Sequence, residues 1–487
     1  MDSFLEKKNI LIIGIGFHAQ RIYVPSIMEF SKSFPIQLVA AVDVHSQKNR
    51  IEDFLKKGRH EIDITYVDPL DSNQSLSKKT VQQLDKLIAS KNISGVIIST
   101  EPLAHKAYAK WALDNELNIL MDKPITTRKH INTDILQATG LISDYEELLN
   151  QYKSNQVRKQ TIFSINTQRR YDSGFKHVHK LITEAKDRFN IPVTSIQAMY
   201  ADGTWLFPNE IITQDSHPYK YGYGMCSHSA YHIFDIIWQF YKAGSIEDKF
   251  PDSMQVYSSF LTPKGYSMQI TEDDYASFLN HSYKSTGFSK DEYASYIKDF
   301  GEIDAFNIIR LLKEGENICN VSMNLMHNSF SRRAWSEPNT DLYKGNGRVK
   351  HQQFVIQQGP FQSIHIHNYQ ASDKHDIDNS QEFEIGGNNH FDIYVFRNAA
   401  MFGTDKPFYK LSSKDILTGS TDRLTVEKAK DSVIYEFLQF ILGAKEKKDL
   451  ISNIDSHSVP VKIMSTLYQS HILSKEGKNP IVTTSLT

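Results

Sequence analysis

A short apolar run ending in a glycine-rich turn is the feature that most constrains the fold of this chain. Residues 9–13 are mainly apolar, and the letters GIGFHA follow at residues 14–19. They match the pattern G-x-G-x-x-G/A, in which the first glycine permits a tight turn and the second lets a pyrophosphate approach the backbone. The following helix N-terminus offers N–H groups to an anion. The turn therefore predicts a dinucleotide site with contacts from Gly14, Gly16, Phe17, His18 and Ala19.

Further apolar runs repeat this pattern along the first third of the chain. They stand at residues 38–42, 61–67, 95–100, 118–121 and 161–166. Helical patterns lie between them, for example at residues 81–90 and 106–115. Strands that alternate with helices indicate an α/β, doubly wound parallel sheet of the Rossmann type. We expect this first domain to span residues 1–168.

The second half of the chain has a different pattern. Residues 256–261 and 363–369 alternate apolar and polar side chains, as half-exposed antiparallel strands do. A helix near residues 433–441 places Val433 and Phe437 on one face and ends at a glycine. We expect residues 169–487 to form an α+β domain with a large, mostly antiparallel open sheet and insertions around residues 262–389.

Composition excludes several classes of partner. The 487 residues carry 55 Lys and Arg against 57 Asp and Glu, a formal charge of −2, which argues against a nucleic-acid partner. No apolar run approaches the length of about 20 residues that a membrane helix needs. Two cysteines and the lack of a recognisable signal peptide suggest a reducing compartment. We therefore expect a cytoplasmic protein with no membrane partner.

The residue that ends the second apolar run bears on which dinucleotide binds. Asp43 stands where a carboxylate can accept hydrogen bonds from the adenosine ribose hydroxyls and would repel a 2′-phosphate. Lys48 and Arg50 are close enough in sequence to reach such a phosphate instead. The pattern favours NAD as the cofactor and leaves NADP possible.

Polar residues follow two of the later strands. Thr100, Pro102 and His105 come after residues 95–99, and Asp122-Lys123-Pro124 comes after residues 118–121. Open α/β sheets bind ligands at the carboxyl ends of their strands. A lysine there can lie beside the nicotinamide and hydrogen-bond a substrate oxygen, so we count Lys123 among the cofactor and catalytic candidates. As an isolated dipeptide, Lys-Pro would also fit a solvated turn.

A third polar segment spans residues 222–235. If it is helical, His228, His232 and Asp235 fall at i, i+4 and i+7 on one face. Three titratable groups on one stripe could form an acid–base array, a metal site or a buried structural histidine pair. His365 and His367 alternate on a later strand, but a metal site would need a third ligand, so we predict no metal.

Taken in order, these segments resemble the Gfo/Idh/MocA family, named for glucose–fructose oxidoreductase and inositol dehydrogenase. The family pattern joins a Rossmann turn, a T-P-x-x-H element, an E-K-P signature and a G-G-x-x-x-D-x-x-x-H-x-x-D helix. Residues 14–19, 100–105, 122–124 and 222–235 correspond to them in that order. The resemblance implies a Rossmann domain followed by an α+β domain whose open sheet builds an oligomer interface. It also implies pyridine-nucleotide redox chemistry on sugars, cyclitols or related polyols.

The resemblance carries roles to particular residues. Lys123 matches the family's active-site lysine, His232 its catalytic histidine, and Asp235 the carboxylate three residues later. Two positions depart from the pattern: Asp122 replaces a glutamate, and His228 stands where many members have an aspartate that works with the histidine. The chain also exceeds the usual family length by more than a hundred residues, which makes it a long variant.

The substrate and the assembly are less defined by the sequence. Trp205, Tyr219 and Lys220 lie just upstream of the catalytic segment and are candidates for substrate contacts, although Trp205 fits a core position equally well. Arg332, Arg333 and Arg348 could reach a larger or anionic substrate, or belong to a surface loop or subunit contact. We expect a small hydroxylated substrate and a homodimer or homotetramer.

Four functional hypotheses remain open at this point. The first is an NAD(P)-dependent dehydrogenase or reductase acting on CH–OH groups. The second is an NAD-dependent glycosidase or lyase that keeps its NAD and uses transient redox chemistry. The third is a non-catalytic cofactor-dependent sensor, and the fourth is a metal-dependent lyase that uses the three residues of the 222–235 segment.

Overall fold

The computed structural model describes residues 7–70, 75–215, 217–279, 283–334, 347–371, 382–417 and 425–486. The chain divides into two compact units. The first unit contains Met1–Thr127, Ile142–Asp172 and Val426–Ser458, and the second contains Arg128–Leu141, Ser173–Thr425 and Val459–Thr487. The expected division at 168/169 lies close to the end of the second of these segments. It does not include the return of residues 426–458 to the first unit.

The first unit is built on a six-stranded parallel sheet in the order β3-β2-β1-β4-β5-β6. Its strands are β1 (Lys8–Ile13), β2 (Ile36–Val44), β3 (Asp63–Val67), β4 (Ile93–Ile98), β5 (Asn118–Met121) and β6 (Phe163–Ile165). This confirms the predicted doubly wound sheet. The strand order reverses between β1 and β4, which is where open α/β sheets bind ligands. The glycine turn directly follows β1 at that point.

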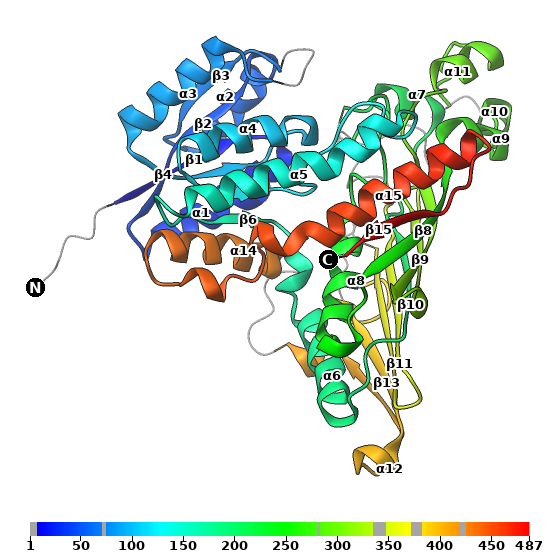
Figure 1. Ribbon diagram of the computed structural model, residues 1–487. Coiled ribbons are helices and arrows are strands. Elements are labelled where there is room, and N and C mark those ends of the chain that lie inside the picture. The colour runs from blue at the N-terminus through cyan, green and yellow to red at the C-terminus, as the bar shows by residue number, and fades with distance from the viewer. Residues whose placement is uncertain are drawn as a thin grey trace, which may run out of the picture. The chain divides into compact units, whose positions relative to one another are not determined.

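Helices pack around this sheet, as Figure 1 shows. They are α1 (Val24–Ser31), α2 (Lys48–Gly58), α3 (Lys78–Lys91), α4 (Pro102–Asp114), α5 (Ile135–Asn155) and α14 (Thr425–Ile441). Apolar side chains of α14, among them Val433 and Phe437, join the buried cluster formed by β1 and α1. A Cβ added to Gly95 would lie only 2.6 Å from Ile441 Cδ1, so the glycine allows α14 to approach β4 closely. The predicted apolar helix face is therefore real, and it belongs to the core of the first unit.

The second unit is built on a nine-stranded sheet in the order β14-β13-β12-β11-β7-β10-β9-β8-β15. Its strands are β7 (Ser195–Ala201), β8 (Ser253–Leu261), β9 (Asp304–Lys313), β10 (Glu316–Met326), β11 (Lys350–Gln358), β12 (Gln362–Gln370), β13 (Asp392–Arg397), β14 (Phe408–Ser412) and β15 (Val482–Ser485). Neighbouring strands are antiparallel except β7 and β10, which are parallel. The predicted mostly antiparallel sheet is confirmed. Strands β9 to β12 lie within the span expected to hold insertions and are part of this sheet.

Among the residues that the structure describes, the helices of the second unit cover one face of its sheet and leave the other open. They are α6 (Ser173–Phe189), α7 (Pro208–Thr213), α8 (Tyr231–Ala243), α9 (Pro263–Gln269), α10 (Glu272–Leu279), α11 (Lys290–Tyr296), α12 (Ala399–Phe402), α13 (Ser413–Ile416) and α15 (Ser458–Lys475). Figure 1 shows α6, α8 and α15 along one face. On the other face the alternate side chains are partly exposed, including Phe306 at 48% and Phe408 at 66%.

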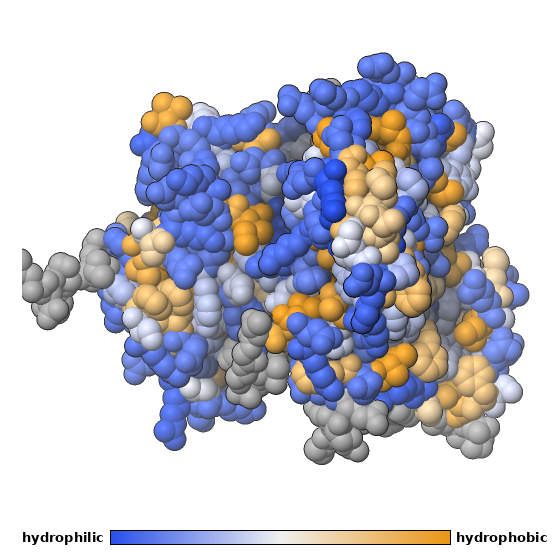
Figure 2. Space-filling view, turned by 90° about the horizontal axis from the view of Figure 1, so that it is seen from below, coloured by the Kyte–Doolittle hydropathy of each residue, from blue (hydrophilic) through white to orange (hydrophobic). Residues whose placement is uncertain are grey.

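The molecular surface is mixed in character. Figure 2 shows hydrophilic side chains over most of the face it presents, with smaller hydrophobic areas between them. None of the helices in the described ranges is both long enough and apolar enough to cross a membrane.

Candidate functional site

The glycine turn is held against the strands on both sides of the switch point. Gly14 has a φ of +86°, and a Cβ there would lie 2.4 Å from the carbonyl oxygen of Ser99, so only glycine fits. A Cβ added to Gly16 would meet no atom within 4 Å, which leaves its backbone facing open space. Phe17 is 75% exposed beside it. A tight turn with an accessible second glycine fits the pyrophosphate of a dinucleotide.

The helix after the turn starts irregularly. Ala19–Tyr23 forms a π-helical turn that runs directly into α1, which has Pro25 in its first turn. Because proline has no N–H and its ring crowds the preceding turn, a wider turn before it relieves both problems. Ala19 is fully buried, as the small third position of the pattern predicts, and His18 remains partly exposed at the mouth of the turn.

Asp43 at the end of β2 fastens the glycine turn. Its Oδ2 accepts a hydrogen bond from the Ile15 N–H at 2.9 Å, and its Oδ1 accepts one from the Val44 N–H at 2.7 Å. Arg50 lies next to it, with its guanidinium 5.2 Å from the Phe17 ring and 3.2 Å from the Ile15 carbonyl oxygen. The contact of Asp43 with a ribose remains a prediction.

The predicted residues after β4 include a histidine that contacts backbone carbonyl groups at the edge of the sheet. His105 is buried, and its two ring nitrogens lie 2.7 Å from the Pro124 carbonyl oxygen and 3.1 Å from the Thr100 carbonyl oxygen. Burial lowers the pKa of His105, although both hydrogen bonds oppose that shift. Pro102 begins α4. His105 thus ties the end of β4 to the segment that carries Lys123, which is a positioning role.

Asp122 is the centre of a buried polar cluster at the same sheet edge. Its Oδ1 accepts hydrogen bonds from the Tyr23 hydroxyl at 2.5 Å and the Asn166 amide at 3.1 Å, and its Oδ2 accepts one from the Ser99 hydroxyl at 2.7 Å. Burial alone would raise the pKa of Asp122, but His18 and these hydroxyl donors hold it below its usual value. We call this set the Asp122 centre.

Lys123 stands beside the Asp122 centre. Burial lowers the pKa of its amine to about 8; Asp122 opposes the shift, and the guanidinium of Arg169 adds to it. Arg169 follows β6 and is itself only 5% exposed. Two cationic groups with one nearby carboxylate make this part of the sheet edge suited to polarising a ligand oxygen.

In the second unit, the predicted catalytic segment is only partly helical. The helix α8 begins at Tyr231, so it carries His232 and Asp235 but not His228. The condition under which all three would share one helix face is therefore not met, because the helix excludes His228. His228 lies in the preceding turn, where its N–H donates to the Gly224 carbonyl oxygen at 2.9 Å. His232 is 8% exposed, and Asp235 is fully buried.

The turn that carries His228 is anchored by a buried carboxyl group. Glu302 Oε1 accepts hydrogen bonds from the Cys226 N–H at 2.7 Å and from the Tyr468 hydroxyl at 2.8 Å. A Cβ on Gly224 would lie 1.8 Å from the Glu302 carbonyl oxygen, so the turn can approach only with glycine there. Burial raises the pKa of Glu302 to about 7.

Four rings surround His228. The His217 ring lies 4.7 Å away, Tyr223 5.2 Å, and Tyr219 and His327 6.4 Å each, between ring centres. His217 adopts a positive φ of 57°, which is unusual for a residue other than glycine. His228 is therefore surrounded by aromatic and imidazole side chains.

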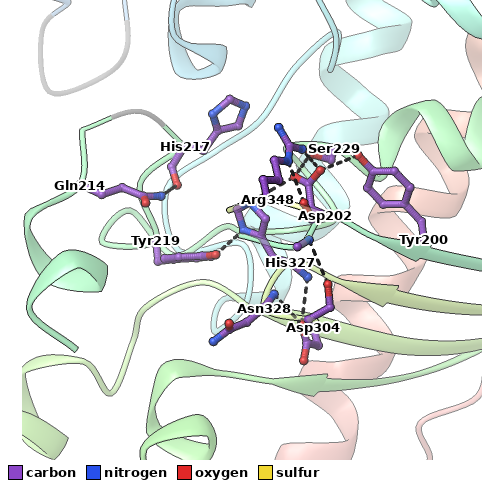
Figure 3. A network of polar contacts seen from close by, with 12 residues as sticks. Tyr200, Asp202, Gln214, His217, Tyr219, Ser229, Asp304, His327, Asn328 and Arg348 are labelled. Atoms are coloured by element: carbon purple, nitrogen blue, oxygen red, sulfur yellow. Dashed lines mark hydrogen bonds and ion pairs between the residues drawn. The ribbon is translucent and has the colours of Figure 1, made fainter. Parts of the chain in front are cut away.

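A second polar cluster adjoins these rings, and Figure 3 shows its members. Asp202, fully buried, accepts hydrogen bonds from the Tyr200 hydroxyl at 2.8 Å and the Ser229 hydroxyl at 3.1 Å. It also pairs with the guanidinium of Arg348 and lies 3.4 Å from Nε2 of His327. We call this set the Asp202 centre.

The geometry of the sheet explains why these residues meet. Strands β7 and β10 are parallel, with Ala201 opposite Met326. The residues that follow them, Asp202 and His327, therefore emerge side by side. Gly203 has a φ of +64°, and a Cβ there would lie 2.1 Å from the Val349 carbonyl oxygen, which lets the Arg348 segment approach.

The three predicted substrate residues differ in their surroundings. Tyr219 is 1% exposed, and its hydroxyl contacts Nδ1 of His327. The Trp205 indole N–H is shared between the hydroxyls of Tyr266 at 3.2 Å and Tyr275 at 3.1 Å, within an aromatic cluster. Lys220 pairs with exposed Asp215 at 3.2 Å. Of the three, only Tyr219 has a described ring contact with His228.

The arginines considered for an anionic substrate have internal partners. Arg333 is 3% exposed and forms two hydrogen bonds, of 2.7 and 2.6 Å, with the carboxylate of Glu210. Arg348 is paired with Asp202. Both guanidinium groups are therefore neutralised within the second unit. Among the residues that the structure describes, no three metal-binding side chains converge.

Sequence patterns did not reveal several residues of the two centres and their surroundings: Tyr23, Asn166 and Arg169 in the first unit, and Glu302, His327 and the role of Arg348 in the second. The sequence feature that could have indicated Asp202 and His327 is their place in the chain, since each directly follows a strand.

Comparison with known proteins agrees with this architecture. Residues 8–140 match the model of the Gfo/Idh/MocA family, described as an oxidoreductase family with an NAD-binding Rossmann fold. No curated protein is similar enough in sequence to count as a match.

Solved structures of low sequence identity share the fold along nearly the whole chain. An oxidoreductase domain protein from Kribbella flavida has a TM-score of 0.58 at 11% identity, over 99% of this chain and 100% of that one. Myo-inositol 2-dehydrogenase from Lactobacillus plantarum has a TM-score of 0.55 at 15% identity, over 99% and 100%. An oxidoreductase from Agrobacterium radiobacter, in complex with NAD+, L-tartaric acid and magnesium, has a TM-score of 0.56 at 11% identity, over 98% of both chains.

The glycine turn at the switch point, the match of residues 8–140 and the shared fold lead to one conclusion: residues 8–140 belong to an NAD-binding Rossmann domain of the Gfo/Idh/MocA oxidoreductase type, and the chain as a whole has the fold of solved oxidoreductases.

Proposed function

We propose that this oxidoreductase transfers hydride between NAD and a hydroxyl-bearing carbon of a sugar, a cyclitol or a similar polyol. When bound, NAD would supply the hydride acceptor for oxidation, and its reduced form would supply the hydride donor for the reverse reaction. The chain's own residues would bind the substrate, polarise the reacting oxygen and move its proton.

The observation that carries this proposal is the setting of Lys123. It follows β5, at the carboxyl edge of the parallel sheet that also carries the glycine turn. Its pKa of about 8, lowered mainly by burial, allows the amine to change protonation near neutral pH. An amine placed at that edge is suited to donating a hydrogen bond to a hydroxyl or carbonyl oxygen.

The remaining roles follow from the family resemblance. His232 would accept the proton of the reacting hydroxyl, with Asp235 or His228 orienting its ring. The carboxylate of Asp43 beside the turn favours NAD over NADP, because it would repel a 2′-phosphate. A 2′-phosphate would need a cationic partner. Arg50 could be that partner only if its guanidinium gave up its contacts with the Ile15 carbonyl oxygen and Asp43.

The direct test mixes the purified protein with NAD or NADP and a panel of polyols and sugars, and follows the absorbance of reduced nicotinamide. We expect NAD to raise the melting temperature more than NADP and at least one polyol to yield reduced cofactor. If neither nucleotide raises the melting temperature, the proposal fails at its first step. NAD that stays bound through turnover without net reduction would favour the transient-redox glycosidase or lyase instead.

The open face of the nine-stranded sheet bears on assembly. Its partly exposed apolar side chains, such as Phe306 and Phe408, are of the kind that mark interaction surfaces. We propose that this face is a subunit contact of a homodimer or a homotetramer. Light scattering on the purified protein tests this, and replacing Phe306 and Ile308 by serine should then yield monomers.

A further inference from the structure

Tyr219, His327 and Asp202 form a line of three polar groups in the second unit (Figure 3). The hydroxyl of Tyr219 is hydrogen-bonded to Nδ1 of His327, and Nε2 of His327 lies 3.4 Å from Oδ2 of Asp202. All three side chains are almost completely buried. In such a buried row, the hydrogen bonds all point the same way, because each group has a limited number of donors and acceptors.

Asp202 sets that direction. Its pairing with Arg348, and the hydrogen bonds it accepts from Tyr200 and Ser229, favour the ionised carboxylate. An ionised carboxylate only accepts hydrogen bonds, so its position 3.4 Å from Nε2 favours the tautomer of His327 that carries the hydrogen on Nε2. Burial lowers the pKa of His327 to about 4, so the ring is neutral at physiological pH and its Nδ1 has no hydrogen. Nδ1 must therefore accept, and the Tyr219 hydroxyl must donate.

The consequence falls on the oxygen of Tyr219. Its single hydrogen is committed to His327, so toward any further partner this oxygen can act only as an acceptor. Within the described part of the chain, it has no second hydrogen-bond partner. The ring of Tyr219 belongs to the group that surrounds His228, and Ser229, the residue next to His228, is hydrogen-bonded to Asp202.

We propose that Tyr219 is a specificity-determining residue that accepts a hydrogen bond from a second hydroxyl, or an amine, of the substrate. This rests on the proposed function and narrows it: the substrate carries a hydrogen-bond donor besides the reacting hydroxyl, as a polyol does and a simple alcohol does not. A carbonyl or ether oxygen at that position is rejected, since two acceptors would face each other in a buried site. His327 and Asp202 are positioning residues that keep Tyr219 in this polarity.

The kinetic test uses Tyr219→Phe with the best polyol of the panel and its monodeoxy analogues. We expect the substitution to lower kcat/KM for the full polyol by about 10- to 100-fold, the cost of leaving one buried hydroxyl without its acceptor. One deoxy analogue should be poor with the unaltered protein and lose nothing further with the variant. An equal loss for every analogue, or no loss at all, overturns the proposal.

A matched control lies on the other face of the same sheet. There Tyr394 donates to Asp392 at 3.4 Å, and His390 lies 3.3 Å from the same carboxylate. Tyr394→Phe removes the same hydroxyl from a similar trio and should change kcat/KM by less than about twofold. The rise in melting temperature with NAD should be retained in both variants, which separates a loss of substrate recognition from a loss of fold.

The direction of hydrogen bonding between Tyr219, His327 and Asp202 can be measured without any turnover of substrate. In protein labelled with 15N-histidine, the ring shifts of His327, assigned by their absence in His327→Gln, should report a neutral ring with its hydrogen on Nε2 between about pH 5 and pH 8. Asp202→Asn can donate to Nε2 and should move the hydrogen to Nδ1. A ring that is protonated, or that carries its hydrogen on Nδ1 in the unaltered protein, overturns the proposal even if the proposed dehydrogenase activity is found. If no polyol is turned over, this measurement still decides the polarity.

Discussion

The Asp122 centre and the Asp202 centre each stabilise an aspartate carboxylate at the end of a strand, but they do so with different partners. Each centre has an aspartate just after a strand, and this aspartate accepts hydrogen bonds from a tyrosine and a serine hydroxyl. Asp122 is satisfied mainly by these uncharged donors and retains 18% exposure of its side chain. Asp202 is fully buried and has a guanidinium and an imidazole as additional partners.

The different exposure of the two carboxylates determines which partners each of them needs. Uncharged donors hold a partly solvated carboxylate at modest cost, and the neighbouring Lys123 remains able to change protonation. A fully buried carboxylate needs a counter-charge, and removing either partner of such a pair leaves an uncompensated ion. The first centre is therefore suited to proton chemistry, and the second is suited to fixing the direction of hydrogen bonds.

The sharpest test of this contrast compares two like substitutions. Asp202→Asn leaves Arg348 buried without its counter-charge and should lower the free energy of unfolding by about 3–5 kcal/mol. Asp122→Asn weakens hydrogen bonds that come mainly from uncharged donors, and should cost about 1–3 kcal/mol. Urea unfolding of both variants measures the difference. A larger cost for Asp122→Asn would remove the basis for the comparison.

The proposed role of the first centre is tested by Lys123→Met. Loss of the amine should lower kcat by about 100- to 1,000-fold, with little change in the affinity for NAD, because the effect of a polarising group appears in the transition state. Lys110→Met is the control, since that lysine is exposed on α4 and faces Asp114. Equal activity of the two variants would exclude Lys123 from the reaction.

The centres should also differ in their response to pH. The pKa of Asp122 is lowered by its partners, so its stabilising effect is present above the usual carboxyl range and is lost only in strong acid. The pKa of Glu302, beside the His228 turn, is raised by burial to about 7, so its contribution is complete below about pH 4.5 and is lost as the pH rises to 7.

Glu302→Gln isolates this effect because it keeps the shape and removes the titration. The stability of the unaltered protein, relative to that of the variant, should fall by on the order of 3 kcal/mol between about pH 4.5 and pH 7. Unfolding curves at several pH values measure it. A difference that stays constant over this range would mean that Glu302 does not titrate there.

The sequence located those site residues that lie beside a strand of the first sheet along the chain. The glycine turn, Asp43 and Lys123 each lie at or near the carboxyl end of a strand of the first sheet, so the alternation of strands and helices was enough to place them at one edge. The Asp202 centre could not be found in this way, since Asp202, His327 and Arg348 are brought together by a parallel pairing of β7 with β10 that local periodicity does not encode.

Other differences have equally specific causes. The helical pattern around His228 was interrupted because Gly224 allows Glu302 to hold the segment in a turn. Trp205 fitted both a sugar-stacking and a core position, and only the hydroxyls of Tyr266 and Tyr275 distinguish them. The apolar face of α14 was visible, but its destination in the core of the first unit was not.

That return of α14 means that the two units are interwoven along the chain. The polypeptide changes unit after residues 127, 141, 172, 425 and 458. A fragment that stops at residue 172 would expose the apolar surface that α14 covers beside Gly95, so it should not behave as an independent cofactor-binding module. Dissection of this protein, whether by proteolysis or by gene truncation, would therefore need to supply residues 426–458 in trans or join them by permuting the termini.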